Sequence, residues 1–297
     1  FFNILFWPYL WENPISKFID VLSYLSEFGN EWMLPSLFFG EIIYAKDMPW
    51  YYSLIWISIT TPIFYLFLFI VGFIFFAAGL FNNFKRNLMS KKFYFDIIFI
   101  SILLIPLIFS MIFHSTSFNG WRHLYFIYPY FIIYCLLGYK KIYRFLTKIK
   151  LYPKIFNLLT FCIILYYAIW IFINHPHQYA YFNKFAGKNI HKNFDIDYWG
   201  LSYKENLNFI LENDNREKIY IKNISENKLF YPLFSLKNKD RKKFIWEFEN
   251  RDPDYIITNY YLEQKYNKFD EKFLEKYFLF KTILVSETPI NTIYKKK

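Results

Sequence analysis

Long apolar runs alternate with short basic segments along the first part of the sequence. The four runs, at residues 50–80, 93–113, 121–139 and 155–173, are close to or above the roughly 20 residues that a helix needs to cross a membrane. Lipid offers backbone polar groups no hydrogen-bond partner, so each run is expected to be a transmembrane helix. Pro62, Pro106 and Pro129 lie within the runs and should kink these helices or mark local irregularity.

Lysine and arginine gather in two of the connections between these runs. The basic residues are Lys85, Arg86, Lys91 and Lys92 after the first run, and Lys140, Lys141, Arg144, Lys148, Lys150 and Lys154 between the third and fourth. Cytoplasmic loops carry an excess of such residues. The segments 12–49, 114–120 and 174–297 are therefore expected on the opposite, external side.

The residues on either side of the apolar runs predict two further regions. Residues 1–49 indicate the end of an upstream span and an external loop with interfacial helices. Residues 174–297 predict a small α/β domain, with helices at 203–212, 240–249 and 261–276 and strands at 218–223, 254–259, 278–285 and 291–296. A capping box formed by Ser202 and Glu205 predicts the start of the first of these helices. A turn at 287–289 precedes the last strand.

The predicted fold is therefore mainly α, a polytopic membrane helix bundle followed by a small extracytoplasmic α/β domain. The sequence begins at Phe1, without methionine and inside an apolar stretch, from which we expect that a longer protein continues upstream.

Composition adds limits on the chemistry. The net charge is +11, but the basic residues beside the spans account for much of it, so no nucleic-acid partner is expected. Cys135 and Cys162 both lie in apolar runs, which argues against a disulfide framework or a zinc site. The sequence contains no Walker, G-x-G-x-x-G or G-x-S-x-G motif. We predict no cofactor and no metal ligands, and the sequence leaves a requirement for a divalent metal open.

A chain of short motifs resembles the lipid-linked-sugar glycosyltransferases of the GT-C class, and most of all family 39, the relatives of protein O-mannosyltransferases and bacterial aminoarabinose transferases. The motifs are WPYLWENP at 7–14, FFG at 38–40, MPWYY at 48–52, GWRHLYFIYPY at 120–130, HPHQYAYFNKFAGKN at 175–189 and DYWG at 197–200. Tyr198 is inserted between the Asp and the Trp of the last motif, and His123 replaces the family's Tyr. The resemblance covers residues 1–207 and implies that this chain is the C-terminal part of such an enzyme, whose catalytic acid lies in an upstream external loop.

Arg122 is the main candidate for binding the donor phosphate, because a cation at the external end of a span departs from the positive-inside pattern. A guanidinium can hold a phosphate through two parallel hydrogen bonds. His123 and His114 are candidates for the same phosphate or for protonating a leaving group. The alternative is that Arg122 is an interfacial anchor beside Trp121 and Tyr125.

Further residues are candidates for a substrate cavity. They are Glu31, Glu41, Asp197, Trp199 and Tyr181. Carboxylates, Asp195 among them, could bind an acceptor hydroxyl or a divalent ion, and the aromatic rings could stack on sugars. The alternative is structural, with the aspartates ending a loop ahead of a capped helix and the aromatic rings packing in the core.

The function predicted from these features is transfer of a sugar from a polyprenyl-phosphate carrier to an acceptor glycan, lipid or protein at the outer face of a membrane. The expected location is a bacterial inner membrane, with membrane lipids as further partners. Two alternatives stay open at this point. One is a transporter or flippase for a lipid-linked or anionic solute, and the other is a non-catalytic membrane anchor that presents the tail as a binding module.

Overall fold

The computed structural model describes residues 2–31, 35–44, 47–87, 91–112, 119–263 and 275–297. The first half contains α1 (Phe2–Phe6), η1 (Pro8–Leu10), α2 (Pro14–Glu31), β1 (Pro35–Phe38), β2 (Glu41–Tyr44), α3 (Tyr52–Thr60), α4 (Ile63–Asn87), α5 (Lys91–Ile112), η3 (Arg122–Ile127) and α6 (Tyr128–Lys148). The second half contains α7 (Pro153–Ile173), η4 (Gln178–Ala180), η5 (Lys184–Ala186), α8 (Ile190–Asn193), α9 (Tyr203–Asn213), β3 (Ile219–Asn223), α10 (Phe230–Phe234), α11 (Asn238–Arg241), β4 (Phe244–Ile245), β5 (Tyr255–Thr258), β6 (Tyr277–Val285) and β7 (Thr288–Lys296).

The described chain is mainly helical, and three of its helices are long and apolar enough to cross a membrane. The apolar segments are Ile63–Phe81 in α4, Phe93–Ile112 in α5 and Pro153–Ile173 in α7. No residue of α7 is buried in the protein, and large apolar side chains on all three helices are exposed. Such a surface is unfavourable in water and suits lipid, so these helices are consistent with a membrane protein.

The first apolar run is not one continuous helix as expected. It is divided at Thr61–Pro62 into α3 and α4, with Thr61 in an extended conformation (φ −100°, ψ 137°). Proline has no N–H to continue the helical ladder and disfavours the helical conformation of the residue before it. Pro106 lies inside α5. Pro129 lies instead in the first turn of α6, where the missing N–H has little cost.

The third apolar run also differs from the expectation. Its first part is the short 3₁₀ helix η3, and α6 begins only at Tyr128. Because α6 extends to Lys148, its second half includes basic residues such as Lys140, Lys141 and Arg144. It is not among the three helices that are apolar enough over a membrane-spanning length.

Helices α4 and α6 cross at two glycines. A Cβ atom built on Gly72 would lie 1.8 Å from the carbonyl oxygen of Tyr134, and one on Gly138 would lie 2.0 Å from that of Leu68. Only glycine therefore permits this approach of the two backbones, a common arrangement where helices associate in lipid. Next to the crossing, the rings of Phe69 and Phe131 stack with centroids 4.4 Å apart.

The C-terminal region contains a mixed five-stranded sheet of order β4-β3-β5-β7-β6. β3 runs parallel to β4 and β5, whereas β7 is antiparallel to β5 and β6. Side chains of α9 and α10, including Leu207, Ile210 and Leu233, form a buried cluster with Ile219 and Ile257 of the sheet. Apolar side chains on alternate positions of the strands thus supply one face of this core.

Most of the predicted elements in this region are present. The helix at 203–212 is α9, and the strands at 218–223, 254–259 and 278–285 are β3, β5 and β6. The last strand begins earlier than expected, at Thr288, because the turn is formed by Ser286 and Glu287, both with positive φ. The prediction of a helix at 240–249 is wrong, because α11 ends at Arg241 and β4 follows. Most of the helix predicted at 261–276 lies outside the described residues.

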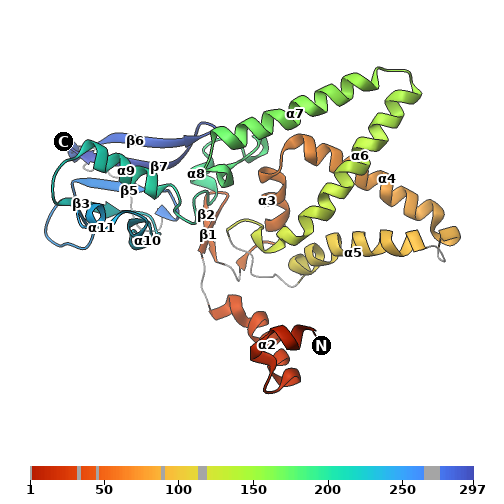
Figure 1. Ribbon diagram of the computed structural model, residues 1–297, viewed down its shortest axis with the longest axis horizontal. Coiled ribbons are helices and arrows are strands. Elements are labelled where there is room, and N and C mark those ends of the chain that lie inside the picture. The colour runs from red at the N-terminus through yellow and green to blue at the C-terminus, as the bar shows by residue number, and fades with distance from the viewer. Residues whose placement is uncertain (1, 32–34, 45–46, 88–90, 113–118, 264–274) are drawn as a thin grey trace.

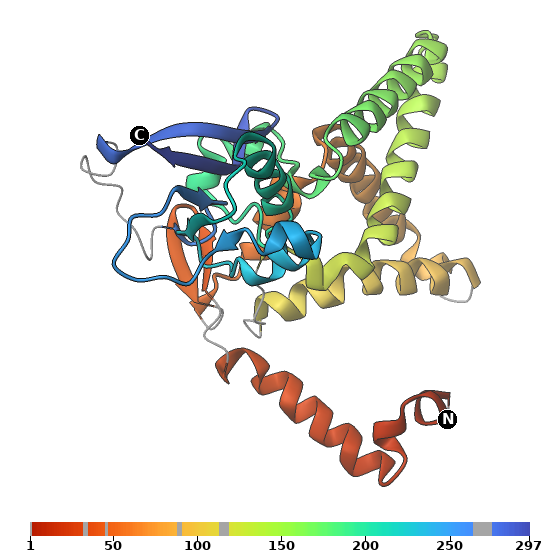
Figure 2. The same ribbon diagram turned by 60° about the vertical axis from the view of Figure 1, so that its left-hand side comes forward.

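A short hairpin, β1–β2, lies between the membrane-type helices and the sheet (Figure 1). Leu37 packs against Tyr261 and Leu262 on the sheet side, whereas Phe38 packs with Tyr52 and Phe194 on the helix side. The connection from α6 to α7 and the C-terminal end of α4 lie at the end of the helices far from the sheet (Figure 1). The segment from α1 to α2 lies apart from the rest of the described chain (Figure 2).

Candidate functional site

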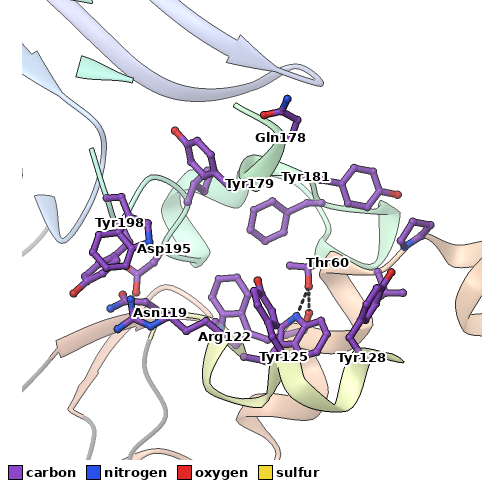
Figure 3. A pocket seen from close by; sticks show the side chains of 18 residues that line it. Thr60, Asn119, Arg122, Tyr125, Tyr128, Gln178, Tyr179, Tyr181, Asp195 and Tyr198 are labelled. Atoms are coloured by element: carbon purple, nitrogen blue, oxygen red, sulfur yellow. Dashed lines mark hydrogen bonds between the residues drawn. The ribbon is translucent and has the colours of Figure 1, made fainter. Parts of the chain in front are cut away.

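A cavity of about 570 Å³ lies where the helices meet the C-terminal region. Its walls come from α3 and the break after it, from η3 and the start of α6, and from the segment between η4 and α9 (Figure 3). The lining residues include Thr60, Arg122, Tyr125, Tyr181 and Tyr198. The cavity therefore joins segments that are far apart in the sequence and includes residues of three motifs that carry the resemblance to glycosyltransferases.

Arg122 is held between the helical region and the C-terminal region. Its guanidinium carbon lies 5.0 Å from the ring centroid of Tyr198 and 5.1 Å from that of Trp199. Its Nε donates to His123 Nε2 at 3.2 Å, so this histidine nitrogen is unprotonated in the structure. Aromatic rings under a guanidinium attract it and help to orient it. Arg122 is therefore a positioned cation on the cavity wall.

The other predicted site residues fall into different places. Tyr181 and Trp199 line the cavity, and their contact with a substrate stays a prediction. Glu41 is exposed at the start of β2 and does not line it, and Glu31 is the last residue of α2. His114 lies outside the described residues, and His123 contacts Arg122 without lining the cavity.

The carboxylate of Asp197 is buried beside the cavity and is fully hydrogen-bonded. Oδ1 accepts from the hydroxyl of Tyr179 at 2.7 Å and from Leu201 N at 3.0 Å. Oδ2 accepts from the backbone N and the hydroxyl of Ser202. These contacts join the loop to the start of α9 and give Asp197 the structural role considered as its alternative. The Ser202 hydroxyl is used here and does not cap α9, so the helix is present without its predicted capping box.

Asp195, two positions earlier, has one satisfied oxygen and one orphaned oxygen. Its Oδ2 accepts from the Ser36 hydroxyl at 2.6 Å and from Leu37 N at 3.0 Å, both on β1. Its Oδ1 is buried and has no hydrogen-bond partner among the described residues. Burial, the dominant effect, raises the pKa of Asp195 to about 7.

Asp195 is also linked to the backbone next to Arg122. The Ser36 hydroxyl that donates to Asp195 lies 3.3 Å from the hydroxyl of Tyr52, which accepts from Gly120 N at 3.1 Å. Gly120 has a φ of 81°, a backbone conformation that favours glycine. The hairpin thus connects the two sides of the cavity, although it does not line it.

Two more buried polar atoms on the cavity wall are orphaned. In the part of the chain that the structure describes, the indole Nε1 of Trp56 and the amide Oδ1 of Asn119 have no hydrogen-bond partner. With Asp195 Oδ1, they are one donor and two acceptors that are buried in residues lining the same cavity. Buried polar groups are normally paired, so this concentration indicates a place where a ligand or water supplies the partners.

Asn183, in the YFN segment of one motif, stabilises the break between α3 and α4. Its Nδ2 donates to the carbonyl oxygens of Ser58 and Thr61, each at 2.6 Å, and its backbone N donates to the carbonyl of Ile59 at 2.8 Å. These are carbonyls near the end of α3, where Pro62 removes the continuing N–H groups. Asn183 therefore anchors the C-terminal region against the helices at the edge of the cavity.

The His-Pro-His segment forms a turn after α7, in which His177 N donates to the carbonyl of Asn174 at 2.6 Å. His175 Nδ1 hydrogen-bonds with the Gln178 side chain at 2.8 Å, and the buried His177 hydrogen-bonds with Glu205 of α9 at 3.1 Å. Among the described residues no group of three or more His, Cys, Asp and Glu side chains could hold a metal ion.

Sequence reasoning missed three features of the site. The orphaned atoms of Trp56 and Asn119 had no signal in the sequence, because burial and pairing depend on tertiary contacts. Ser36 lies 159 positions from Asp195 and was likewise not identified. A search of protein-family models, curated proteins and solved structures finds no match to this chain.

Proposed function

We propose that this protein is a membrane glycosyltransferase that moves a sugar from a polyprenyl-phosphate carrier to an acceptor at the outer face of the membrane. The observation that carries the proposal is the position of Arg122. The guanidinium of this arginine lies over two aromatic rings on the wall of a cavity at the ends of apolar helices.

The position of Arg122 suits a lipid-borne phosphate. The cavity is bounded by Pro62, directly before α4, and by η3, so a polyprenyl chain could lie along the apolar helices while its phosphate reaches the guanidinium. A guanidinium pairs with phosphate through two charge-assisted hydrogen bonds, and it would stabilise the charge on phosphate as the leaving group departs.

The remaining cavity wall suits a sugar. It combines aromatic faces, among them Trp56, Trp121 and Tyr181, with the polar side chains of Thr60 and Gln178. Ligand sites are typically apolar surfaces with a few fixed polar groups, which together accommodate the C–H faces and hydroxyls of a sugar ring.

The sidedness of the proposal rests on the basic connections. The turn between α6 and α7, which contains Lys150 and is flanked by Lys148 and Lys154, lies at the opposite end of α6 from η3, whose residues line the cavity (Figure 1). If these connections are cytoplasmic, as the positive-inside rule predicts, the cavity opens on the external side. In this proposal α6 also crosses the membrane and joins α4, α5 and α7 in one bundle.

The two alternatives make different predictions. A transporter needs polar or ionisable groups along a path through the membrane, whereas the orphaned polar atoms described above border a cavity at the ends of the helices. A non-catalytic anchor predicts that no lipid phosphate binds and that changing Arg122 has no effect.

The test is binding of undecaprenyl phosphate in detergent micelles to the whole protein as the cell makes it, with Arg122→Ala, Arg122→Lys and a control. Loss of a hydrogen-bonded charge pair of roughly 1.5–3 kcal/mol predicts about 10- to 100-fold weaker binding for Arg122→Ala. Arg122→Lys keeps the positive charge but cannot form two parallel hydrogen bonds, so its affinity should lie between those of wild type and Arg122→Ala. Arg144→Ala, at an exposed position toward the other end of α6, is the matched control and should bind as wild type. Equal binding by Arg122→Ala and Arg144→Ala would remove Arg122 from the site and the proposal with it.

A further inference from the structure

The cavity contains a carboxyl group whose two oxygens are in different situations. Asp195 is 5% exposed, and Oδ2 is fixed by Ser36 and Leu37 of β1. Oδ1 has no hydrogen-bond partner among the described residues. A structural role explains Oδ2 alone. Leaving the other oxygen of a buried carboxyl unpaired is costly, so Oδ1 needs a different explanation.

Asp197 is a second buried carboxyl in the same loop and serves as a comparison, because both of its oxygens are hydrogen-bonded. It is as deeply buried as Asp195, but Tyr179, Leu201 and Ser202 all donate to its two oxygens. The difference between two aspartates in the sequence Asp-Ile-Asp therefore does not come from burial. It comes from a partner that is missing at Asp195 and present at Asp197.

The orphaned groups near Asp195 indicate what the missing partner is. Asn119 Oδ1 needs a donor, and Trp56 Nε1 needs an acceptor, and both residues line the cavity that Asp195 borders. A hydroxyl group both donates and accepts a hydrogen bond, so a hydroxylated ligand can satisfy orphans of both kinds. A purely anionic ligand has no proton to offer the two oxygens.

We propose that Asp195 is the proton acceptor of this site and takes its proton from the acceptor hydroxyl bound in the cavity. This inference rests on the proposed glycosyl transfer. The acceptor oxygen forms a bond to the anomeric carbon of the donor sugar, its proton passes to Asp195 Oδ1, and the bond from the anomeric carbon to the phosphate oxygen breaks. The bonding electron pair leaves with the phosphate, which Arg122 holds. The resemblance to GT-C enzymes implies an acidic residue in an upstream loop, whereas Asp195 supplies such a residue within this chain.

The protonation behaviour of Asp195 agrees with this role. Burial raises its pKa to about 7, in the range where a carboxyl can accept and later release a proton near neutral pH. The groups that face it are the Ser36 hydroxyl and Leu37 N on β1, together with the neutral phenols of Tyr52 and Tyr261, and Arg122 lies on the same cavity.

A chemical labelling experiment tests whether Asp195 Oδ1 can be reached from the cavity. Dicyclohexylcarbodiimide is an apolar reagent that modifies protonated carboxyl groups, and mass spectrometry of peptides locates the adduct. We expect labelling of Asp195 at pH 6, at least tenfold less at pH 8.5, and protection by undecaprenyl phosphate-linked hexose. Asp197 is the internal control, matched in burial and lying in the same loop, and should remain unlabelled. Equal resistance of both aspartates would overturn the inference.

Turnover then tests the role of the carboxyl. The assay measures release of undecaprenyl phosphate from undecaprenyl-phosphate-linked hexoses by the whole protein in membranes of the cells that make it, which supply the acceptor hydroxyl, with Asp195→Asn and Ser36→Ala compared with wild type. Asparagine keeps the shape and can still accept from Ser36 and Leu37 N, but it cannot take a proton. We expect a loss of about 10²- to 10⁴-fold for Asp195→Asn with undecaprenyl phosphate binding unchanged. Ser36→Ala removes a hydrogen bond that positions Asp195 but keeps the base, so we expect a partial loss that is smaller than the loss for Asp195→Asn.

The outcomes separate this inference from the function on which it rests. Release by wild type and equal release by Asp195→Asn would overturn the role of Asp195 and leave the glycosyl-transfer proposal in place. Absence of release by wild type, together with binding of undecaprenyl phosphate that does not depend on Arg122, would remove both.

Discussion

The crossing of α4 and α6 at Gly72 and Gly138 gives the sharpest structural prediction, because a single methyl group tests it. Gly138→Ala places a Cβ atom 2.0 Å from the carbonyl oxygen of Leu68. Carbon and oxygen atoms in close contact are about 3.3 Å apart, so the helices must separate by roughly 1.3 Å at this point. The oxygen belongs to the backbone and the backbone fixes the position of Cβ, so no side-chain rotation relieves the clash.

The energetic effect combines a clash with lost packing. A gap of about 1 Å removes a quarter to a half of the dispersion energy of each contact that opens. Overpacking of this kind costs about 1–3 kcal/mol, which outweighs the gain of up to about 1 kcal/mol from replacing glycine by alanine within a helix. α6 begins directly after η3, which carries Arg122, so separation of the helices should also disturb the cavity.

Thermal unfolding in detergent micelles, followed by tryptophan fluorescence, measures this effect. Gly79→Ala is the matched control, because it lies on α4 and a Cβ atom built there meets no heavy atom within 4 Å. Gly138→Ala should unfold about 2–10 °C below wild type, and Gly79→Ala at or slightly above wild type. The double variant Gly72→Ala/Gly138→Ala should cost less than the sum of the two single changes, because the first alanine already separates the helices.

Equal melting temperatures for Gly138→Ala and Gly79→Ala would refute the close crossing. Full additivity of the two alanines would show that they act at independent positions.

Two further predictions concern residues at the edge of the cavity. Asn183→Ala removes two buried hydrogen bonds to the carbonyls of Ser58 and Thr61 and should destabilise the protein by about 2–3 kcal/mol in denaturant unfolding. The exposed Asn213→Ala is its control and should change stability by less than about 0.5 kcal/mol; equal effects would contradict the anchoring role. For Asp195, the folded-state pKa of about 7 lies above the value of about 3.9 for an unfolded chain. Between these values the unfolded carboxyl is ionised and the folded one is protonated, so stability should fall as pH rises from about 4 to 7, by at most about 4 kcal/mol. Asp195→Asn lacks this contribution, and a pH profile of unfolding that is the same in both proteins would show that the group titrates normally.

The sequence pattern was sufficient for elements that depend on local periodicity. The alternation of apolar residues identified β3, β5 and β6, and the apolar positions of α9 identified that helix within one residue at its end. It was not sufficient where a tertiary partner decides the structure. The helix α9 is present, but Ser202 and Glu205 contact Asp197, His177 and Lys281 in place of the predicted capping contacts.

The apolar runs also contained more structure than their hydropathy indicates. Pro62 signalled a local irregularity, but the carbonyls of Ser58 and Thr61 at the break are satisfied by Asn183, which lies more than a hundred positions away. The hairpin β1–β2 has only four residues in each strand, too few for a recognisable alternation, and part of its stability comes from Asp195 and Phe194.

The site could be predicted only in part, because some of its features depend on tertiary contacts that the sequence does not show. Arg122 was identifiable because its charge departs from the distribution of basic residues, and that signal is present in the sequence. The contrast between Asp195 and Asp197 was not identifiable, because both are aspartates in one short segment. Only the positions of Ser36, Tyr179 and Ser202 distinguish a carboxyl that is fully paired from one that is half paired.

The central claim is that the cavity with Arg122 and the basic turn between α6 and α7 lie on opposite sides of a membrane. Single cysteines at the exposed positions Ser235, in the C-terminal region, and Lys148, at the end of α6, test it in a background with Cys135 and Cys162 replaced by alanine. The cells are treated with a membrane-impermeant maleimide, intact or after permeabilisation. If the C-terminal region is external, Ser235→Cys is labelled in intact cells, whereas Lys148→Cys is labelled only after permeabilisation. Labelling of Lys148→Cys in intact cells, with Ser235→Cys protected, would contradict it.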